Sequence, residues 1–417
     1  MTSQLYSFVT EKSSKKTLEL LQSPSNSSPT AEIKFKILSA GLTANNKFYL
    51  DFGEKAPFNF FKCYPVGDKD TSIIDPKNEA TSDTLADTYV HPPVWGLCQV
   101  IESKVEGVAE GTVYRAMLPL GAHVEFEKAH LEPKTDNLVV HRPTTNPAYN
   151  AFIPIPPNSV CHPSSEATCA VALTCFPGIV TGFGLYFELQ RKNFYGDRDT
   201  IVITSASSKV ALALALYLKH NQHGKKIIGY TSDKHRGFVE GTKLYDTILG
   251  YDDALPAEAG PNSAVCVDIS GKGTVFQNNQ DKIAKLLVVG NSSGSPEKES
   301  TFANFSFFAT VKMILTMTMI FPTWVTNALN TKQDLYLIFV TVEALTKDWG
   351  TDKYLKTLED YTKLFCTAAK DWGVKVRDCG SEESIQQAFQ EIVEGTVPPS
   401  ECVVVDVAKA VEHRKTS

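Results

Sequence analysis

The chain has 417 residues, of which 42% are hydrophobic and 21% charged, and a formal net charge of -6 at pH 7. This composition excludes an intrinsically disordered chain, and the length suits two or three domains of roughly 150 residues each. The acidic balance argues against nucleic acid as the main partner, because phosphate binding depends on clustered Lys and Arg.

The chain begins with MTSQLYSFVTEKSSKK, which lacks the apolar run of a secretory signal peptide, so we expect a cytoplasmic protein. Its nine cysteines are scattered singly, without a CxxC pair or a cluster with histidine. We therefore expect reduced, mostly buried thiols, and neither a disulfide framework nor a metal site.

The first part of the chain carries short β-like runs separated by Gly, Pro and Asp. The Ser- and Pro-rich segment 22–30 predicts a surface loop. From residue 33 to about 160 the runs are EIKFKILSA, VWGLCQVIES, TVYRAMLPL, AHVEFE and NLVVHR. Closely spaced runs of this kind predict a compact, barrel-like β domain.

The pattern changes near Ser164, where a long helix-like stretch leads into buried apolar runs that alternate with helical segments. The strand-like runs are DTIVIT, KKIIGYTS, SAVCVDIS and KLLVVGNSSG. This alternation predicts an α/β fold with a doubly wound parallel sheet. We expect residues 334–342 to supply its last strand, followed by two amphipathic helices and the strand ECVVVDV. Ser381 is the expected N-cap of the second helix, and Gly395 its stop.

The most apolar stretch runs from Phe307 to Val325 but contains Lys312 and Pro322. Its uninterrupted apolar part is shorter than the ~18 residues of a membrane-spanning helix, so we predict no membrane span. Two interpretations stay open. The stretch either lines a pocket for a small hydrophobic substrate or forms a helix buried between the subunits of a homodimer.

The loop after the first strand of a doubly wound sheet faces the ligand crevice, and the next helix offers N–H groups and a positive dipole end to phosphate. Here Ser205, Ser208 and Ala211 stand where a dinucleotide-binding fingerprint has glycine. Their side chains crowd the backbone, so a purely structural turn is the alternative. Lys209 favours a bound anion, because a cation is unfavourable at a helix start without one. The candidate cofactor-binding residues of this loop are Ser205, Ala206, Ser207, Ser208 and Lys209.

The end of the second strand, GYTSDKHRG, lacks the acidic residue that would bind the adenosine ribose hydroxyls. It offers hydroxyl and basic groups suited to a 2′-phosphate, so NADP(H) is favoured over NAD. The alternative is a polar helix start on the surface. Further candidate cofactor-binding residues are Tyr230, Thr231, Ser232, Lys234 and Arg236, with His235 beside them, and Gly290 and Asn291 after a later strand.

These elements, in this order, resemble the nucleotide domain of the medium-chain dehydrogenase/reductase superfamily, in its quinone-oxidoreductase-like part. The motifs are TIVITSASSKVALALALYLK, the turn at Ile248–Asp253, AVCVDISGKG, KLLVVGNSSG and the closing SEESIQQAFQEIVEGTVPPSECVVVDV. The segments AGLTANNKFYLDFG, AYNAF and SASSK look closest to a branch catalogued only as a domain of unknown function. The resemblance extends from about Ala31 to the end of the chain.

The resemblance implies a GroES-like catalytic domain at residues 1–178, with residues 346–417 returning to it, and a Rossmann-type nucleotide-binding domain at 179–345. It also implies NADP(H)-dependent hydride transfer to or from a hydrophobic enone, quinone or carbonyl compound. Zinc-dependent members have a Cys near AGLTANN and a His-Glu pair near VWGLC, where this chain has Thr43 and Trp95-Gly96-Leu97. The four clustered Cys of the structural zinc lobe are also missing, so we expect zinc independence.

The same resemblance places Thr43 and Asn46 beside the nicotinamide and substrate, with Tyr49 close by as a proton donor. Asn45-Asn46 is equally typical of a cap at a strand-to-helix junction. Tyr149 and Asn150 either face the active-site cleft or form a turn in which the tyrosine packs on the core.

Three further residues invite a catalytic interpretation but fit a structural one better. His123 and His130 flank a β segment without a carboxylate at useful spacing, and Cys175 has no histidine base nearby in the sequence. The rival functional hypothesis is a non-redox enzyme, such as a lyase or hydrolase, or a ligand-binding protein on the same scaffold. The missing glycines of the loop favour this rival.

Overall fold

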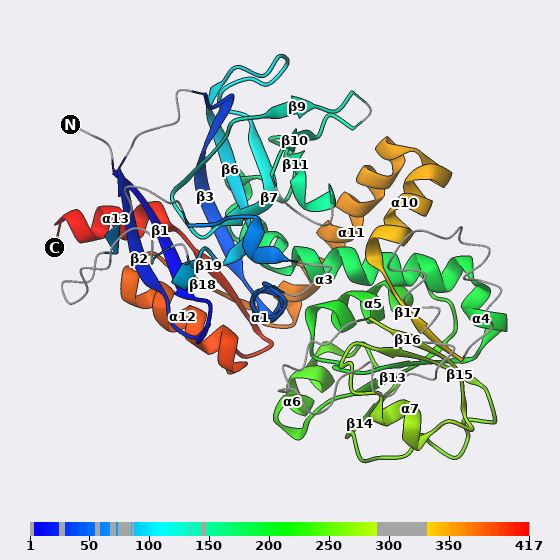
Figure 1. Ribbon diagram of the computed structural model, residues 1–417. Coiled ribbons are helices and arrows are strands. Elements are labelled where there is room, and N and C mark those ends of the chain that lie inside the picture. Colours follow the sequence, from blue (N-terminus) through cyan, green and yellow to red (C-terminus); the bar gives the residue numbers. More distant parts are fainter. Residues whose placement is uncertain are drawn as a thin grey trace. The chain divides into compact units, whose positions relative to one another are not determined.

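The structure is a computed structural model that describes residues 4–24, 30–54, 59–66, 72–73, 85, 87–133, 135–142, 147–289 and 332–416 (Figure 1). The chain forms two compact units. The first comprises Met1–Cys175 and Val374–Ser417, and the second comprises Phe176–Gly373.

The first unit contains a nine-stranded sheet in the order β18-β19-β3-β6-β7-β11-β10-β9, with β8 also paired to β3. All its strand pairs are antiparallel except β18 with β19. A second sheet has the order β4-β2-β1-β5. The strands are β1 (Gln4–Glu11), β2 (Glu19–Pro24), β3 (Ile33–Leu42), β4 (Ser72–Ile73), β5 (Tyr89–Val90), β6 (Pro93–Ser103), β7 (Val113–Pro119), β8 (His123–Phe126), β9 (Ala129–Leu131), β10 (Leu138–Val140), β11 (Ala151–Pro154), β18 (Lys375–Cys379) and β19 (Glu401–Val405).

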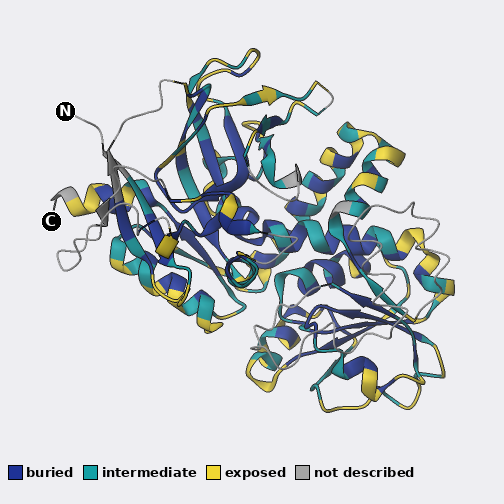
Figure 2. Cartoon of the chain, in the orientation of Figure 1, coloured by how far each residue is buried: buried dark blue, intermediate teal, exposed yellow. Residues whose placement is uncertain are grey.

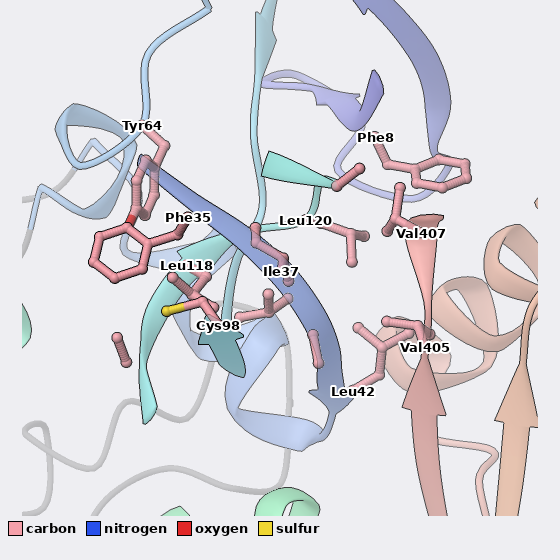
Figure 3. Close-up of a cluster of buried hydrophobic side chains, with 14 of the residues drawn as sticks. Phe8, Phe35, Ile37, Leu42, Tyr64, Cys98, Leu118, Leu120, Val405 and Val407 are labelled. Atoms are coloured by element: carbon pink, nitrogen blue, oxygen red, sulfur yellow. The ribbon is translucent and has the colours of Figure 1, made fainter. Parts of the chain in front are cut away.

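The core of the first unit gathers aromatic side chains from β3, β7, β8 and β11. The Phe35 ring stacks on the Phe152 ring at 5.1 Å between centroids and meets Tyr114 edge-on at 6.1 Å. Every residue of β7 is buried, so both faces of this strand are covered. Figure 3 shows side chains of β1, β3 and β19 in the same cluster. The predicted β-rich domain is therefore confirmed.

The helices of the first unit are α1 (Ala44–Asp51), α12 (Glu382–Glu394) and α13 (Val407–Thr416), and one-turn 3-10 helices lie at Phe60–Lys62, Pro147–Asn150 and Pro163–Ser165. The predicted ends of α12 are confirmed. Ser381 is its N-cap and forms a reciprocal capping box with Ser384, and Gly395 ends it at φ 70°. Glycine suits that left-handed position because it has no Cβ to clash.

The second unit contains six parallel strands in the order β14-β13-β12-β15-β16-β17. They are β12 (Thr200–Ile203), β13 (Lys226–Tyr230), β14 (Thr247–Leu249), β15 (Ala264–Asp268), β16 (Ile283–Val288) and β17 (Gln333–Leu335). Between them run α5 (Lys209–His220), α6 (Asp233–Thr242) and α7 (Thr274–Asn278), with α5 and α7 on opposite faces (Figure 1). Figure 2 shows the sheet as the buried centre of this unit. The prediction of a doubly wound parallel sheet is confirmed.

Helix α3 (Glu166–Arg191) packs against α5 through small residues. A Cβ added at Gly182 would lie 2.6 Å from the Ala213 Cβ, and one at Gly178 would lie 2.7 Å from the Lys209 Cβ. Among the described residues, Pro163–Arg191 is the one helical stretch long and apolar enough to cross a membrane, and 72% of its most apolar window is buried inside the protein. That burial is typical of a core helix.

Two expectations about the second half of the chain need correction. The strand expected at 334–342 ends at Leu335, and α10 (Ile338–Trp349) follows, because a short apolar run has no periodicity that separates strand from helix. The chain returns to the first unit at Val374, not at residue 346. The reason is α11 (Thr351–Asp371), which packs Tyr354 on Phe183 and Tyr361 on Tyr217.

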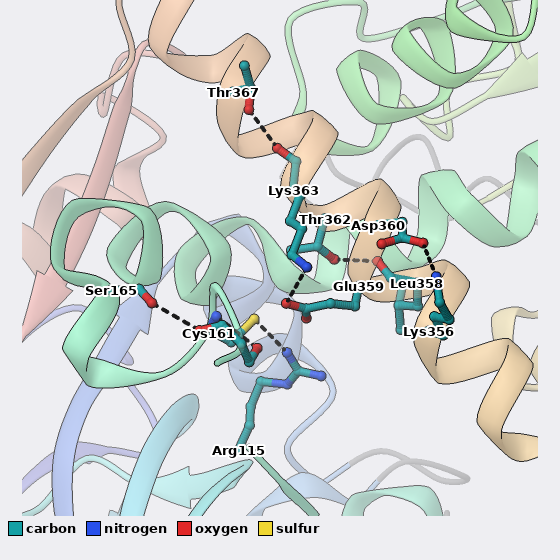
Figure 4. Close-up of polar contacts among 11 residues, drawn as sticks. Arg115, Cys161, Ser165, Lys356, Leu358, Glu359, Asp360, Thr362, Lys363 and Thr367 are labelled. Atoms are coloured by element: carbon teal, nitrogen blue, oxygen red, sulfur yellow. Dashed lines mark hydrogen bonds and ion pairs between the residues drawn. The ribbon is translucent and has the colours of Figure 1, made fainter. Parts of the chain in front are cut away.

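The surface of α11 carries ion pairs one turn apart, Lys356–Asp360 at 3.1 Å and Lys363–Glu359 at 3.9 Å (Figure 4). Such pairs stabilise an exposed helix by only a few tenths of a kcal/mol.

The apolar stretch 307–325 and the candidates Gly290 and Asn291 lie outside the described residues.

Candidate functional site

The point where the strand order reverses lies between β12 and β15, and the two loops that leave it are joined by a buried carboxylate. Asp268, 1% exposed, accepts hydrogen bonds from Thr204 Oγ1 and Ser270 Oγ, both at 2.6 Å. The backbone N–H groups of Gly271 and Gly273 also donate to it, at 3.1 and 2.8 Å. Four donors therefore fix the loop after β15 against the end of β12.

The loop after β12 has a strained start and a capped end. Ser205 has φ 50°, in the left-handed region, and its N–H donates to the Tyr251 hydroxyl at 3.0 Å. The Ala206 carbonyl accepts from the Tyr245 hydroxyl at 2.9 Å. Ser208 caps α5 by accepting the Ala211 N–H. The two tyrosines thus hold the loop in place from the segments before and after β14.

The start of α5 has backbone N–H groups for which the described residues supply no acceptor. Ser208 is its N-cap and leads into Lys209, the first helical residue. Among the hydrogen bonds of the described residues, none satisfies the N–H of Ser207 or of Val210. Unsatisfied N–H groups and the positive dipole end at such a helix start favour a phosphate.

The end of β13 brings the basic segment next to this loop. His235 Nδ1 lies 3.3 Å from Ser207 Oγ, and Lys234 is exposed. The Arg236 guanidinium donates to the Ile248 carbonyl at 3.0 Å and lies 3.6 Å from Asp233. His235 therefore contacts the loop after β12, whereas Arg236 is directed toward β14.

Four of the predicted cofactor-binding residues near the nucleotide loop have positions that burial or helix capping explains. Tyr230 and Ala206 are fully buried and Thr231 is 1% exposed, so their side chains face the core. Tyr230 donates from its hydroxyl to the Asp253 carbonyl, and burial raises its pKa. Ser232 is the N-cap of α6 but makes no capping hydrogen bond from its side chain.

Sequence reasoning missed Asp268, Tyr245 and Tyr251 as members of this site. A signal existed for two of them. Asp268 directly follows the buried run AVCV, at the carboxyl edge where ligands bind, and Tyr251 stands in the Gly-Tyr-Asp turn after β14. Burial raises the pKa of Tyr251, so its hydroxyl stays protonated at neutral pH.

In the first unit, the candidates Thr43 and Asn46 form the start of α1. Thr43 is the N-cap, and the Asn46 side chain completes a capping box by accepting the Thr43 N–H at 2.7 Å. Asn46 is 2% exposed and also donates from Nδ2 to the Pro93 carbonyl at 2.9 Å. The geometry is that of the cap interpretation, and it ties α1 to β6.

Tyr49 lies one turn further along α1, in a cluster of aromatic rings. Its hydroxyl accepts a hydrogen bond from Trp95 Nε1 at 2.9 Å, and its ring packs on Phe60 at 4.8 Å. Tyr149 packs on the same Phe60 at 5.5 Å and near Trp95 at 6.4 Å. The structure thus brings two candidate tyrosines, Tyr49 and Tyr149, to one cluster.

Burial controls the protonation of both tyrosines. Tyr49 is 4% exposed, and burial raises its pKa to about 12 against the opposing hydrogen bond from Trp95. Burial, and then the proximity of Tyr49, raise the pKa of Tyr149 further. Both phenols are therefore neutral at physiological pH and can donate, not accept, a proton.

Arg142 holds the turn that contains Tyr149 and Asn150. Its guanidinium donates to the Asn150 Oδ1 at 3.0 Å and to the Tyr149 carbonyl, and lies over the Tyr64 ring at 4.4 Å. The turn after Pro147 is a single 3-10 turn, as the structural interpretation predicts. Both Tyr149 and Asn150 keep part of their surface exposed.

The remaining sequence candidates have local partners. Cys175 is buried, with its sulfur 3.5 Å from Cys402 Sγ, and His130 Nδ1 lies 3.0 Å from His141 Nε2 on the surface. Arg115 donates to Cys161 Sγ at 3.4 Å (Figure 4). Throughout the described part of the chain, no three His, Cys, Asp or Glu residues group in a way that suits a metal ion.

The fold of this chain is similar to that of solved oxidoreductases. The yhdH oxidoreductase from Salmonella enterica, solved in complex with NADP, matches with a TM-score of 0.51 and 10% identity over 97% of this chain and 99% of that one. A mutant enoyl thioester reductase from Candida tropicalis matches with a TM-score of 0.51 and 12% identity over the same shares.

Within that fold, the sequence itself identifies a narrower group. Residues 40–398 match the family described as protein of unknown function DUF2855, and the chain belongs to this family. No functionally curated protein matches the sequence. The predicted fold and the suspected branch of unknown function are both confirmed.

Proposed function

We propose that the protein is a zinc-independent, NADP(H)-dependent oxidoreductase that transfers a hydride to or from a hydrophobic enone, quinone or carbonyl compound. The observation that carries the proposal is the switch point, the place between β12 and β15 where the strand order reverses. There the loops after both strands meet through Thr204 and Asp268. In open parallel sheets, ligands bind at this point, outside the carboxyl ends of the strands.

The residues at the switch point fit a dinucleotide. The start of α5, with Ser207, Ser208 and Lys209, would hold the pyrophosphate, since its N–H groups and positive charge suit that anion. Lys234 and Arg236 would hold the 2′-phosphate that distinguishes NADP from NAD. Ser232, the exposed N-cap of α6, precedes them in the chain. The similarly folded yhdH oxidoreductase was solved with NADP, which supports the same cofactor here.

When bound, NADP(H) would supply the hydride, and the protein would position the reactants and supply the proton. Tyr49 is the candidate proton donor, because its pKa of about 12 keeps it neutral and Trp95 Nε1 occupies its oxygen as a donor. Thr43, Asn46, Tyr149 and Asn150 are then positioning residues, since capping and aromatic contacts fix α1 and the 3-10 turn. Zinc independence rests on residue identity, with Thr43 where zinc-dependent members of the superfamily have Cys.

The first test is calorimetric titration of the purified full chain with NADPH and with NADH. We expect saturable binding that is tighter for NADPH and at least tenfold weaker in Lys209→Ala, because loss of one charge-assisted phosphate contact costs about 1.5–3 kcal/mol. Lys226→Ala is the matched control, since it removes the same charge from the exposed amino end of β13. Enones, quinones and carbonyl compounds are then screened for NADPH oxidation.

One observation favours the rival, a non-redox enzyme or ligand-binding protein on this scaffold. The Tyr251 hydroxyl already occupies the Ser205 N–H, and serine side chains stand where glycines would admit a pyrophosphate. Failure of both nucleotides to bind at about millimolar concentration, the weak end of specific affinities, would refute the oxidoreductase proposal in favour of this rival.

A further inference from the structure

We propose that His235 makes recognition of the 2′-phosphate proton-linked, so that NADPH binding takes up a proton at this imidazole and the preference for NADPH over NADH rises as pH falls. This inference rests on the proposed function and adds its regulation by pH. It concerns a residue that lies beside the basic groups Lys234 and Arg236 and is the one in direct contact with the loop after β12.

The position of His235 follows from the parallel register of β12 and β13. The carboxyl ends of these neighbouring strands lie side by side, so the loop after β12 meets the start of α6. His235 is the third residue of α6, and its backbone N–H donates to the Ser232 carbonyl at 3.0 Å. Its Nδ1 lies 3.3 Å from Ser207 Oγ. The ring therefore reaches from the segment assigned to the 2′-phosphate to Ser207, in the segment assigned to the pyrophosphate.

The charges around His235 favour its neutral form in the free protein. On its own helix the nearest bases are Lys234 and Arg236, and burial first and Lys234 second lower the pKa of His235. Asp233 is turned toward Arg236, at 3.6 Å. In the loop after β12, the neutral Ser207 faces His235, and Lys209 follows at the start of α5.

The turn after β14 also supplies carboxylates, Asp252 and Asp253. Asp253 is engaged by the Gly250 N–H at 2.7 Å, and Asp252 is exposed to solvent. Among the described residues, no carboxylate forms an ion pair with His235. A neutral imidazole in a basic surrounding, with no acidic partner, gains a proton when a dianion arrives next to it.

The sign of the effect follows from this change of state. A 2′-phosphate raises the pKa of His235 from its lowered value in the free protein, so binding takes up a proton. NADPH affinity then increases as pH falls, by at most about tenfold per pH unit for one proton. NADH carries the pyrophosphate but lacks the 2′-phosphate, so its affinity should show a smaller slope. Below about pH 6 the phosphate itself becomes protonated, which limits the useful range to roughly pH 6–8.

The experiment measures the dissociation constants of NADPH and NADH for the full-length protein at about pH 6.5, 7 and 8, the range in which histidine titrates. We expect the preference for NADPH to be at least fivefold greater at the lowest of these values than at the highest. His235→Gln keeps a hydrogen-bonding side chain but cannot titrate, so its preference should be nearly constant. His220→Gln, an exposed histidine at the other end of α5, is the matched control and should behave as wild type.

Two readouts separate the possible failures. If NADPH binds but the slope is the same in wild type and His235→Gln, the inference is refuted while the proposed function stands. If neither nucleotide binds, the proposed function fails and the inference fails with it. Should His235→Gln not fold, the imidazole of the wild-type protein is titrated by NMR. An upward shift of the His235 pKa that is larger with NADPH than with NADH supports the inference, and equal shifts overturn it.

Discussion

The buried carboxylate of Asp268 offers the sharpest test of how the switch point is built. Replacing it with alanine removes the acceptor of four donors at once, the hydroxyls of Thr204 and Ser270 and the N–H groups of Gly271 and Gly273. These groups sit at the carboxyl ends of β12 and β15, where the side chain of Asp268 is 1% exposed. Water has little access to replace the lost acceptor.

The size of the effect follows from the number and burial of the donors. The substitution leaves two hydroxyls and two N–H groups without their acceptor. Each buried donor that stays unsatisfied costs about 1–3 kcal/mol. We therefore expect Asp268→Ala to lower the stability of the second unit by about 3–5 kcal/mol. Asp268→Asn keeps one acceptor oxygen and should lose less.

Hydrogen exchange of the amides in β12 and β15 reports the opening free energy of this unit without contributions from the other one. Asp246→Ala is the matched control, because Asp246 is exposed and accepts a single N–H, from Ile227 at 2.7 Å. It should lose about 1 kcal/mol or less. A loss below about 1 kcal/mol in Asp268→Ala would show that the network does not hold the two loops together, and our reasoning about the switch point would be wrong.

Two further predictions concern local packing and capping. Gly182→Val should destabilise the second unit by about 2–3 kcal/mol in urea unfolding, because a Cβ would lie 2.6 Å from the Ala213 Cβ and 2.9 Å from the Leu214 N. The control Gly237→Ala, where a Cβ meets open space, should be neutral or slightly stabilising. Equal effects of the two substitutions would refute the packing argument. Ser381→Ala should cost about 1 kcal/mol by loss of the α12 cap, measured by thermal unfolding, and an unchanged midpoint would contradict this.

Local and periodic signals made much of the second unit predictable. Continuous buried runs such as AVCVD, alternating with helical segments, are typical of strands in a covered parallel sheet. In the first unit, Ser381 caps the start of α12 and Gly395 ends it, as local capping rules predict. Non-local pairing was beyond such signals. The parallel pair β18 and β19 joins the sheet of the first unit where Val405 pairs with Ala40, more than three hundred residues away in the sequence. Neither segment carries a local pattern that predicts this pairing.

The candidate sites divide in the same way. The sequence left two interpretations of Asn46 open. The choice between them depended on Pro93, whose carbonyl accepts a hydrogen bond from the Asn46 side-chain amide. The sequence pointed to Tyr49 by its residue type alone. Its neutral state follows from burial, which raises its pKa against the hydrogen bond from Trp95 of β6. Local sequence patterns can therefore identify candidate residues, but contacts between distant segments determine their hydrogen-bond partners and protonation states.

The substitution Ser205→Gly tests whether the missing glycines of the nucleotide loop matter. Ser205 has φ 50°, and a non-glycine residue in that region costs about 1–2 kcal/mol. Glycine relieves this strain but gains roughly 0.5–1 kcal/mol of entropy in the unfolded chain, so stability should change by less than about 1 kcal/mol. The backbone N–H that donates to Tyr251 is unaffected.

The effect on NADPH binding separates two roles of this serine. If its Cβ only crowds the approach of a pyrophosphate, Ser205→Gly should bind NADPH more tightly than wild type, and Ser205→Ala, which keeps the Cβ, should match wild type. If both variants bind less tightly, the hydroxyl itself holds the phosphate, and the expectation of tighter binding is refuted. In that case the serines replace, by side-chain hydrogen bonds, the close backbone approach that glycine permits in a dinucleotide fingerprint.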